Sequence, residues 1–184
     1  MRPVRREDLI DFVTYEERRE GIRREALAEK APRRVHVGDV LTFLFETTLT
    51  MRYQIQEMMR TERMVRETDI QHEIDTYNEV LGGPGELGAT LLIEIDDAEE
   101  RATKLVEWVT LPEHLYVLLA DGKKVRATID ARQISSERVS AVQYLRFPVA
   151  GRVPVAIGAD HPRLTVEAKL SAEQRAALER DLST

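Results

Sequence analysis

The sequence contains no cysteine among its 184 residues. A chain without cysteine forms no disulfide and supplies no thiolate nucleophile. By itself it also ligates neither a cysteine-bound zinc ion nor an iron–sulfur cluster. The absence is compatible with a reducing compartment. The common thiol-based chemistries are thus excluded for this chain.

Long apolar runs and a surplus of basic residues are also missing. No segment approaches the roughly 18 consecutive apolar residues of a membrane span. The basic start at residues 1–8 is not followed by the apolar region of a signal peptide. The net charge is −6, whereas nucleic-acid-binding proteins usually carry a basic surplus. We therefore expect a cytoplasmic protein that binds neither nucleic acid nor membrane.

Metal-ligand and nucleotide motifs are absent in usable form. The four histidines (His36, His72, His114 and His161) are scattered, and none has the spacing that brings two ligands onto one helix face. Residues 83–88 match the glycine pattern of a dinucleotide loop, but a predicted helix precedes them and a predicted strand follows, which is the reverse of the required order. We interpret this segment as a linker and predict no metal and no cofactor.

Hydrophobic residues make up 42% of the chain and charged residues 33%, enough for a sizeable core with solvated helix faces. The first half predicts four helices and one hairpin. The helices are expected over residues 7–13, 14–30, 49–67 and 68–81, and the hairpin turns at Gly38-Asp39.

The second half is richer in strands. Strands are predicted over residues 89–95, 115–120, 125–129, 141–147, 153–157 and 164–168. A helix capped by Asp96 or Asp97 lies among them, and a last helix begins at the Ser171/Gln174 capping box.

Early helices followed by antiparallel hairpins favour the α+β class, with an inserted hairpin among the N-terminal helices and two helices covering a mainly antiparallel C-terminal sheet. We predict one domain over residues 1–184. A hinge at residues 82–88 would divide a helical half, 1–81, from a strand-rich half, 89–184.

Glu62 is the strongest anomaly in the pattern. On a continuous helix over residues 49–67 it falls within the apolar face that Met51, Ile55 and Met59 define. A carboxyl group there loses hydration, so its pKa would rise, as in general acids and bases. The alternative is a structural ion pair with an arginine such as Arg66.

The opposite side of the same predicted helix is polar. It carries Arg52, Tyr53, Gln56, Glu57, Arg60 and Arg63. Such a run is usually a solvated face, but arginine and tyrosine are also favoured at protein interfaces. We take Arg52, Tyr53, Gln56, Arg60 and Arg63 as the candidate partner-binding surface.

Asp160-His161-Pro162 is predicted to lie in a loop after an apolar strand. Two interpretations stay open. The neighbouring carboxylate and the rigid proline would orient the imidazole for chemistry, or the three residues simply form a turn.

Several blocks of the sequence resemble the bacterial domain-of-unknown-function family numbered 3501. They are residues 51–60 (MRYQIQEMMR), 44–46, 73–78, 140–147 and 158–162. That family has no settled activity, so the resemblance transfers no catalytic residue. Its genes often lie beside those of rubrerythrin-like and heterodisulfide-reductase-like iron–sulfur proteins, which implies a redox or oxidative-stress setting.

Two functions follow from these patterns. The first is an accessory or interaction protein of a redox system, which would bind an iron–sulfur or rubrerythrin-like partner and form a homo-oligomer. The second is a small-molecule enzyme using acid–base or metal-assisted chemistry, with Glu62, Glu57, Asp160 and His161 as candidate residues.

Overall fold

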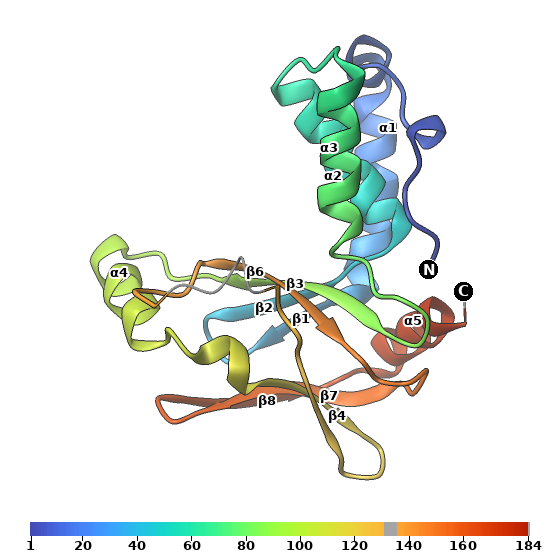
Figure 1. The fold of residues 1–184 in the computed structure, drawn as a ribbon. Coiled ribbons are helices and arrows are strands. Elements are labelled where there is room, and N and C mark those ends of the chain that lie inside the picture. Colours follow the sequence, from blue (N-terminus) through green and yellow to red (C-terminus); the bar gives the residue numbers. More distant parts are fainter. Residues whose placement is uncertain (131–135, 184) are drawn as a thin grey trace.

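The helices and strands of the chain form two parts that share one junction (Figure 1). The structure, a computed structural model, describes residues 1–130 and 136–183. Two antiparallel sheets enclose an apolar core, and three helices stand on the outer side of one sheet as a projection. The predicted α+β class, with N-terminal helices, an early hairpin and a mainly antiparallel C-terminal part, is confirmed.

The projection consists of α1 (Phe12–Lys30), α2 (Thr48–Thr61) and α3 (Glu67–Asn78). α1 begins after Asp11, whose carboxylate accepts two backbone N–H groups of the first turn. The separate helix predicted over residues 7–13 is therefore wrong. Only a 3₁₀ turn, η1 (Arg6–Asp8), forms there, because Leu9 is extended and Asp11 caps the next helix.

The long helix predicted over residues 49–67 is also wrong, because the chain reverses after Thr61. Glu62 lies outside the helical dihedral region and Arg63 has a φ of 51°. The reversal lets Ile70 and Ile74 of α3 pack in one cluster with Ile55 of α2, which a single straight helix does not allow. Burial of both apolar faces thus favours the break.

Sheet A has the strand order β1-β2-β3-β6 and sheet B the order β5-β4-β7-β8. The strands of sheet A are β1 (Arg34–Val37), β2 (Leu41–Phe45), β3 (Leu87–Ile93) and β6 (Val142–Phe147). Those of sheet B are β4 (Leu115–Leu119), β5 (Lys124–Arg126), β7 (Pro154–His161) and β8 (Leu164–Lys169). The early hairpin β1–β2 therefore joins strands from the second half of the sequence.

Alternation along each strand fills the space between the sheets. Leu41, Phe43 and Phe45 of β2 point into the core with Leu115 and Val117 of β4, and all five are buried. The other side of β2 carries Thr42 and Leu44, and Glu46 follows on the same side; all three are buried as well. Sheet A is therefore covered on both faces at the end where the projection stands.

Two further helices are α4 (Ala98–Glu107) and α5 (Ala172–Leu182), with 3₁₀ turns η2 (Ala31–Arg33) and η3 (Leu111–His114). Asp97 caps α4, and the predicted Ser171/Gln174 capping box begins α5. A buried bidentate ion pair of 2.7 and 2.8 Å between Arg33 and Asp181 joins α5 to η2. Within the described part of the chain, no helix combines the length and the apolar character needed to cross a membrane.

The glycine-rich segment predicted as a hinge packs closely against the residues that follow α3, at the base of the projection. A β-carbon at Gly88 would lie 2.0 Å from the carbonyl oxygen of Val80, and one at Gly82 would lie 2.5 Å from that of Glu86. These positions need glycine because backbone from neighbouring segments occupies the space of a side chain. The division into two halves at residues 82–88 stays a prediction.

We expect Gly88→Ala to destabilise the fold by about 3 kcal/mol or more, because the obstructing atom is backbone and cannot move aside cheaply. Gly21→Ala is the matched control, since its β-carbon on α1 meets nothing within 4 Å. That change should stabilise by about 0.5–1 kcal/mol. Urea denaturation midpoints of both variants test this; similar values for the two would contradict it.

Candidate functional site

The polar face of α2 packs against α1 within the chain. Glu57 accepts a hydrogen bond of 2.6 Å from the hydroxyl of Tyr15 and two bonds of 2.8 and 3.0 Å from Arg19. Tyr15 is fully buried. The contact with Arg19, before any other cause, lowers the pKa of Glu57. Glu57 is thus a charged structural partner rather than an acid poised near neutrality.

Gln56 does not belong to an accessible surface either. It is 3% exposed, and its side-chain amide both accepts from the backbone N–H of Ile10 at 2.8 Å and donates to the Ile10 carbonyl at 3.0 Å. These two bonds attach the N-terminal segment to α2. The N-terminal segment covers Gln56, so it is not exposed on the face predicted to bind a partner.

Arg52 and Tyr53 are half-buried near the base of the projection. The ammonium group of Lys30 lies 5.2 Å from the ring centre of Tyr53, a cation–π arrangement within the chain. Of the five residues predicted to form a partner surface, only Arg60 and Arg63 reach the far end of the projection.

Glu62 lies in the reversal between α2 and α3 and is exposed to water. The prediction that it occupies the apolar face is wrong, because that interpretation required the helix to continue through residue 67. Met64 and not Glu62 turns back towards the helix, and its N–H donates to the carbonyl of Met59 at 2.9 Å. The case for Glu62 as a desolvated acid therefore has no structural basis.

The far end of the projection, which we call the tip, is formed by Phe12, Val13, Glu16, Arg60 and residues 62–66. Two shallow grooves of about 400 and 440 Å³ meet there and share Arg63 as a lining residue. Val13 is 57% exposed and Val65 is 74% exposed. Figure 1 shows the start of α1 and the α2–α3 reversal at this same end. The tip therefore combines exposed apolar side chains with arginine.

Asp160 and His161 lie on strand β7 and not in the predicted loop. Asp160 receives two bonds of 2.6 and 2.9 Å from Arg126 and one of 2.9 Å from Lys124 on the outer face of sheet B. These cations, Arg126 first, lower the pKa of Asp160 far below its usual range. Asp160 does not orient His161, because neighbouring strand residues point to opposite faces.

His161 points inward and is 4% exposed. Its Nδ1 accepts the backbone N–H of Arg163 at 3.2 Å, and its Nε2 lies 3.2 Å from the hydroxyl oxygen of Thr110. The ring of His114 meets it edge-on, with centres 5.1 Å apart. Burial lowers the pKa of His161, and His114 and Arg163 lower it further. A lowered pKa favours the neutral imidazole, and both of its ring nitrogens contact groups of the same chain.

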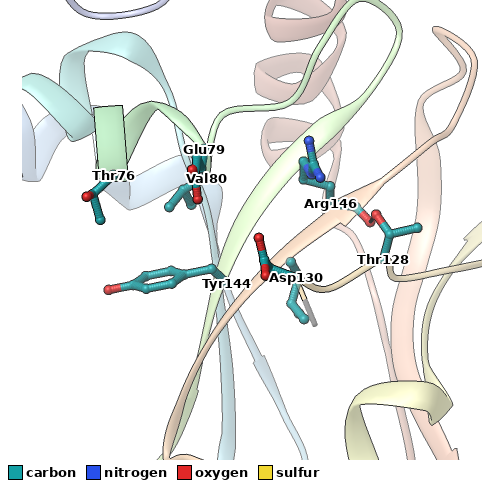
Figure 2. A pocket seen from close by; sticks show the side chains of 8 residues that line it. Thr76, Glu79, Val80, Thr128, Asp130, Tyr144 and Arg146 are labelled. Atoms are coloured by element: carbon teal, nitrogen blue, oxygen red, sulfur yellow. Dashed lines mark hydrogen bonds between the residues drawn. The ribbon is translucent and has the colours of Figure 1, made fainter. Parts of the chain in front are cut away.

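A separate cleft of about 490 Å³ lies where α3 meets sheet A. Figure 2 shows Thr76, Glu79 and Val80 on one side, with Tyr144 and Asp130 opposite them. Thr128, Leu145 and Arg146 complete the lining. Burial raises the pKa of Tyr144, and Tyr77 and Glu46 add to that effect. Tyr144 therefore remains a neutral phenol, whose hydroxyl group can donate or accept a hydrogen bond.

The cleft and the burial of Glu46 were not predicted. Glu46 follows a strand of alternating apolar residues, so its position facing away from the core indicates exposure to solvent. Only the helices standing on sheet A bury it. In the part of the chain that the structure describes, no group of three histidine, aspartate or glutamate side chains is placed to hold a metal ion.

We expect Glu57→Ala to destabilise the fold by about 2–3 kcal/mol, because the buried Tyr15 hydroxyl and Arg19 lose their acceptor. Glu62→Ala is the control on the same segment and should change stability by less than about 0.5 kcal/mol. The lowered pKa means that the Glu57 contribution is present above the ordinary carboxyl value of about 4.3 and is lost as pH falls. Equal costs for the two variants in chemical denaturation would refute this assignment.

His161 should titrate below the ordinary histidine value of about 6.5, since protonation would put a charge in a buried site beside His114. The folded state then resists a proton that the unfolded chain accepts, so stability falls as pH drops below about 6.5. NMR titration of the imidazole signals tests this, with His161→Gln to assign the resonance. A midpoint at or above the ordinary value would show that the burial argument fails.

Comparison with known proteins places this architecture in a family. The family model described as "Protein of unknown function (DUF3501)" matches residues 3–182. A crystal structure of a novel protein of unknown function from Burkholderia pseudomallei K96243 is similar, with 30% identity and a TM-score of 0.90. The match covers 98% of this chain and 100% of that one. A comparison with curated proteins found no match. The chain therefore belongs to the DUF3501 family of proteins of unknown function.

Proposed function

We propose that this protein is a cytoplasmic accessory protein of a bacterial redox or oxidative-stress system, and that it binds a partner protein through the tip of the projection. The redox setting rests on the gene neighbourhood that the family resemblance implies. The partner would then be a rubrerythrin-like or iron–sulfur protein, which supplies a cysteine-ligated redox centre that this chain by itself cannot form.

The exposed valines at the tip are the observation that carries this proposal. Val65 is 74% exposed and Val13 is 57% exposed, beside the unusual backbone of Arg63. Removing such a side chain from water stabilises a complex by about 1.5–3 kcal/mol when it is fully buried. Arginine is also enriched where proteins meet. The tip projects away from the sheets and carries exposed valines and arginine, so it is suited to insertion into a groove on a partner protein.

The ion pairs elsewhere support a binding role over a catalytic one. Glu57, Asp160 and His161 each contact groups of the same chain, which accounts for their positions without a substrate. Acid–base chemistry needs a group within hydrogen-bond reach of the substrate. These residues instead hold α1 to α2 and order sheet B.

The enzyme built on Glu62 and His161 finds no support in the geometry. Glu62 lies at the tip, whereas His161 lies on β7, in the sandwich that sheets A and B form (Figure 1). The two groups are carried on opposite parts of the molecule. The cleft beside Tyr144 keeps small-molecule binding open as a second role, because it places hydroxyl, carboxyl and guanidinium groups around one space.

We expect Val65→Asp and Val13→Asp each to weaken binding to the rubrerythrin-like or iron–sulfur protein of the same host by about tenfold or more. A charge would replace an apolar contact at the centre of the interface. Val106→Asp is the matched control, because Val106 is 55% exposed but lies on α4. Calorimetric titration of the purified proteins measures the affinities.

Three results would count against the proposal: no binding by the native chain, equal affinity for tip and control variants, or self-association as the sole event blocked by the tip changes. In the last case sedimentation would show a homo-oligomer formed through the tip, which is the oligomeric alternative.

A further inference from the structure

Glu46 occupies the short connection between the sandwich and the projection. It follows β2 directly and precedes Thr47, the residue that caps α2. Its backbone N–H donates to the carbonyl of Gly88 at 2.9 Å, which extends the pairing of β2 with β3 by one residue. The side chain is 4% exposed and lies under the helices. A change in the protonation of Glu46 therefore acts at the junction between the two sheets and the projection.

The carboxyl group of Glu46 contacts two hydroxyl groups from different elements. Oε1 lies 2.6 Å from Thr90 Oγ1 on β3, and Oε2 lies 2.6 Å from Thr50 Oγ1 on α2. Thr50 Oγ1 also accepts the backbone N–H of Thr47 at 2.8 Å and lies 3.0 Å from the Thr47 carbonyl oxygen. One carboxyl group thus links β3, the start of α2 and its cap.

The number of hydroxyl protons available in this network favours a protonated Glu46. Thr50 has a single hydroxyl proton, which cannot go to both the Thr47 carbonyl and Glu46. If Glu46 carries a proton on Oε2, it donates to Thr50, and Thr50 donates to the Thr47 carbonyl. All the contacts then form at once. An ionised Glu46 would instead accept the hydrogen bond of the Thr50 hydroxyl. The hydrogen bond from Thr50 to the Thr47 carbonyl would then not form.

The surroundings also disfavour a charge. Burial raises the pKa of Glu46, and this effect outweighs the opposing hydrogen bonds from Thr50 and Thr90. Lys30 on α1 and Arg34 on β1 act on Glu46 through their charge alone, whereas its hydrogen bonds come from Thr50 and Thr90. On the side of β6 the facing group is Tyr144, whose pKa is itself raised.

We propose that Glu46 is a proton-dependent latch: its protonated carboxyl group fixes the start of α2 to sheet A, and loss of that proton to solvent loosens the projection. On opening, the O–H bond of Glu46 breaks, the proton passes to water, and the resulting carboxylate becomes hydrated. The closed state binds one proton more than the open state. Opening therefore becomes easier as pH rises from the ordinary carboxyl value of about 4.3 towards the value in the closed state.

Hydrogen exchange at the backbone amides of Thr47, Thr50 and Met51 tests the latch between pH 5 and pH 8. In the native chain the opening equilibrium constant should rise by up to about tenfold per pH unit, beyond the intrinsic effect of pH on exchange. Glu46→Gln should abolish the rise, because the carboxamide permanently donates to Thr50 and accepts from Thr90. Glu94→Gln is the matched control: Glu94 accepts a threonine hydroxyl, that of Thr42, but is itself exposed.

A native-like rise in the Glu46→Gln variant, or no rise in the native chain, would overturn the proposal. Infrared spectroscopy of the native protein gives an independent reading if the variant fails to fold. A protonated carboxyl band that disappears, as pH rises, in step with the loss of protection supports the latch, and a loss of protection without any such change in the band overturns it. Neither measurement depends on the partner binding proposed for the tip.

Discussion

The two residues that connect β2 to α2 link the projection to sheet A. Glu46 and Thr47 turn the chain from a strand of sheet A into the central helix of the projection within one short step. A carboxyl group buried at such a turn needs partners from both sides, and it finds them in Thr90 on β3 and Thr50 on α2. These bonds link the start of α2 to sheet A.

Arginine–carboxylate pairs complete the assembly around that joint. Arg19 with Glu57 holds α1 to α2, Arg33 with Asp181 holds α5 to η2, and Arg126 with Asp160 joins β5 to β7. Each pair joins elements that lie far apart in the sequence. An acidic chain rich in arginine thus uses its charges to fix its architecture. The residues that attract a chemical interpretation in the sequence are largely these structural partners.

Local patterns predicted the elements that depend on local physics. The Gly38-Asp39 turn, the Asp97 cap and the Ser171/Gln174 box all lie where the sequence places them. The helix over residues 49–67 failed for a non-local reason. Residues 62–66 are compatible with a helix, but packing of Ile70 and Ile74 beside Ile55 requires the chain to reverse there.

The sequence by itself determined the fold class, the family and the absence of thiol chemistry, because composition, turn residues and alternation are properties of short segments. Only the tertiary structure decided which side chains meet. Exposure of Glu62, burial of Gln56 and Glu46, and the pairing of Tyr15 with Glu57 all depend on how helices and sheets pack across long separations. Spacing along a helix gives the direction of a side chain, but burial depends on what covers that direction, and distant segments supply the cover.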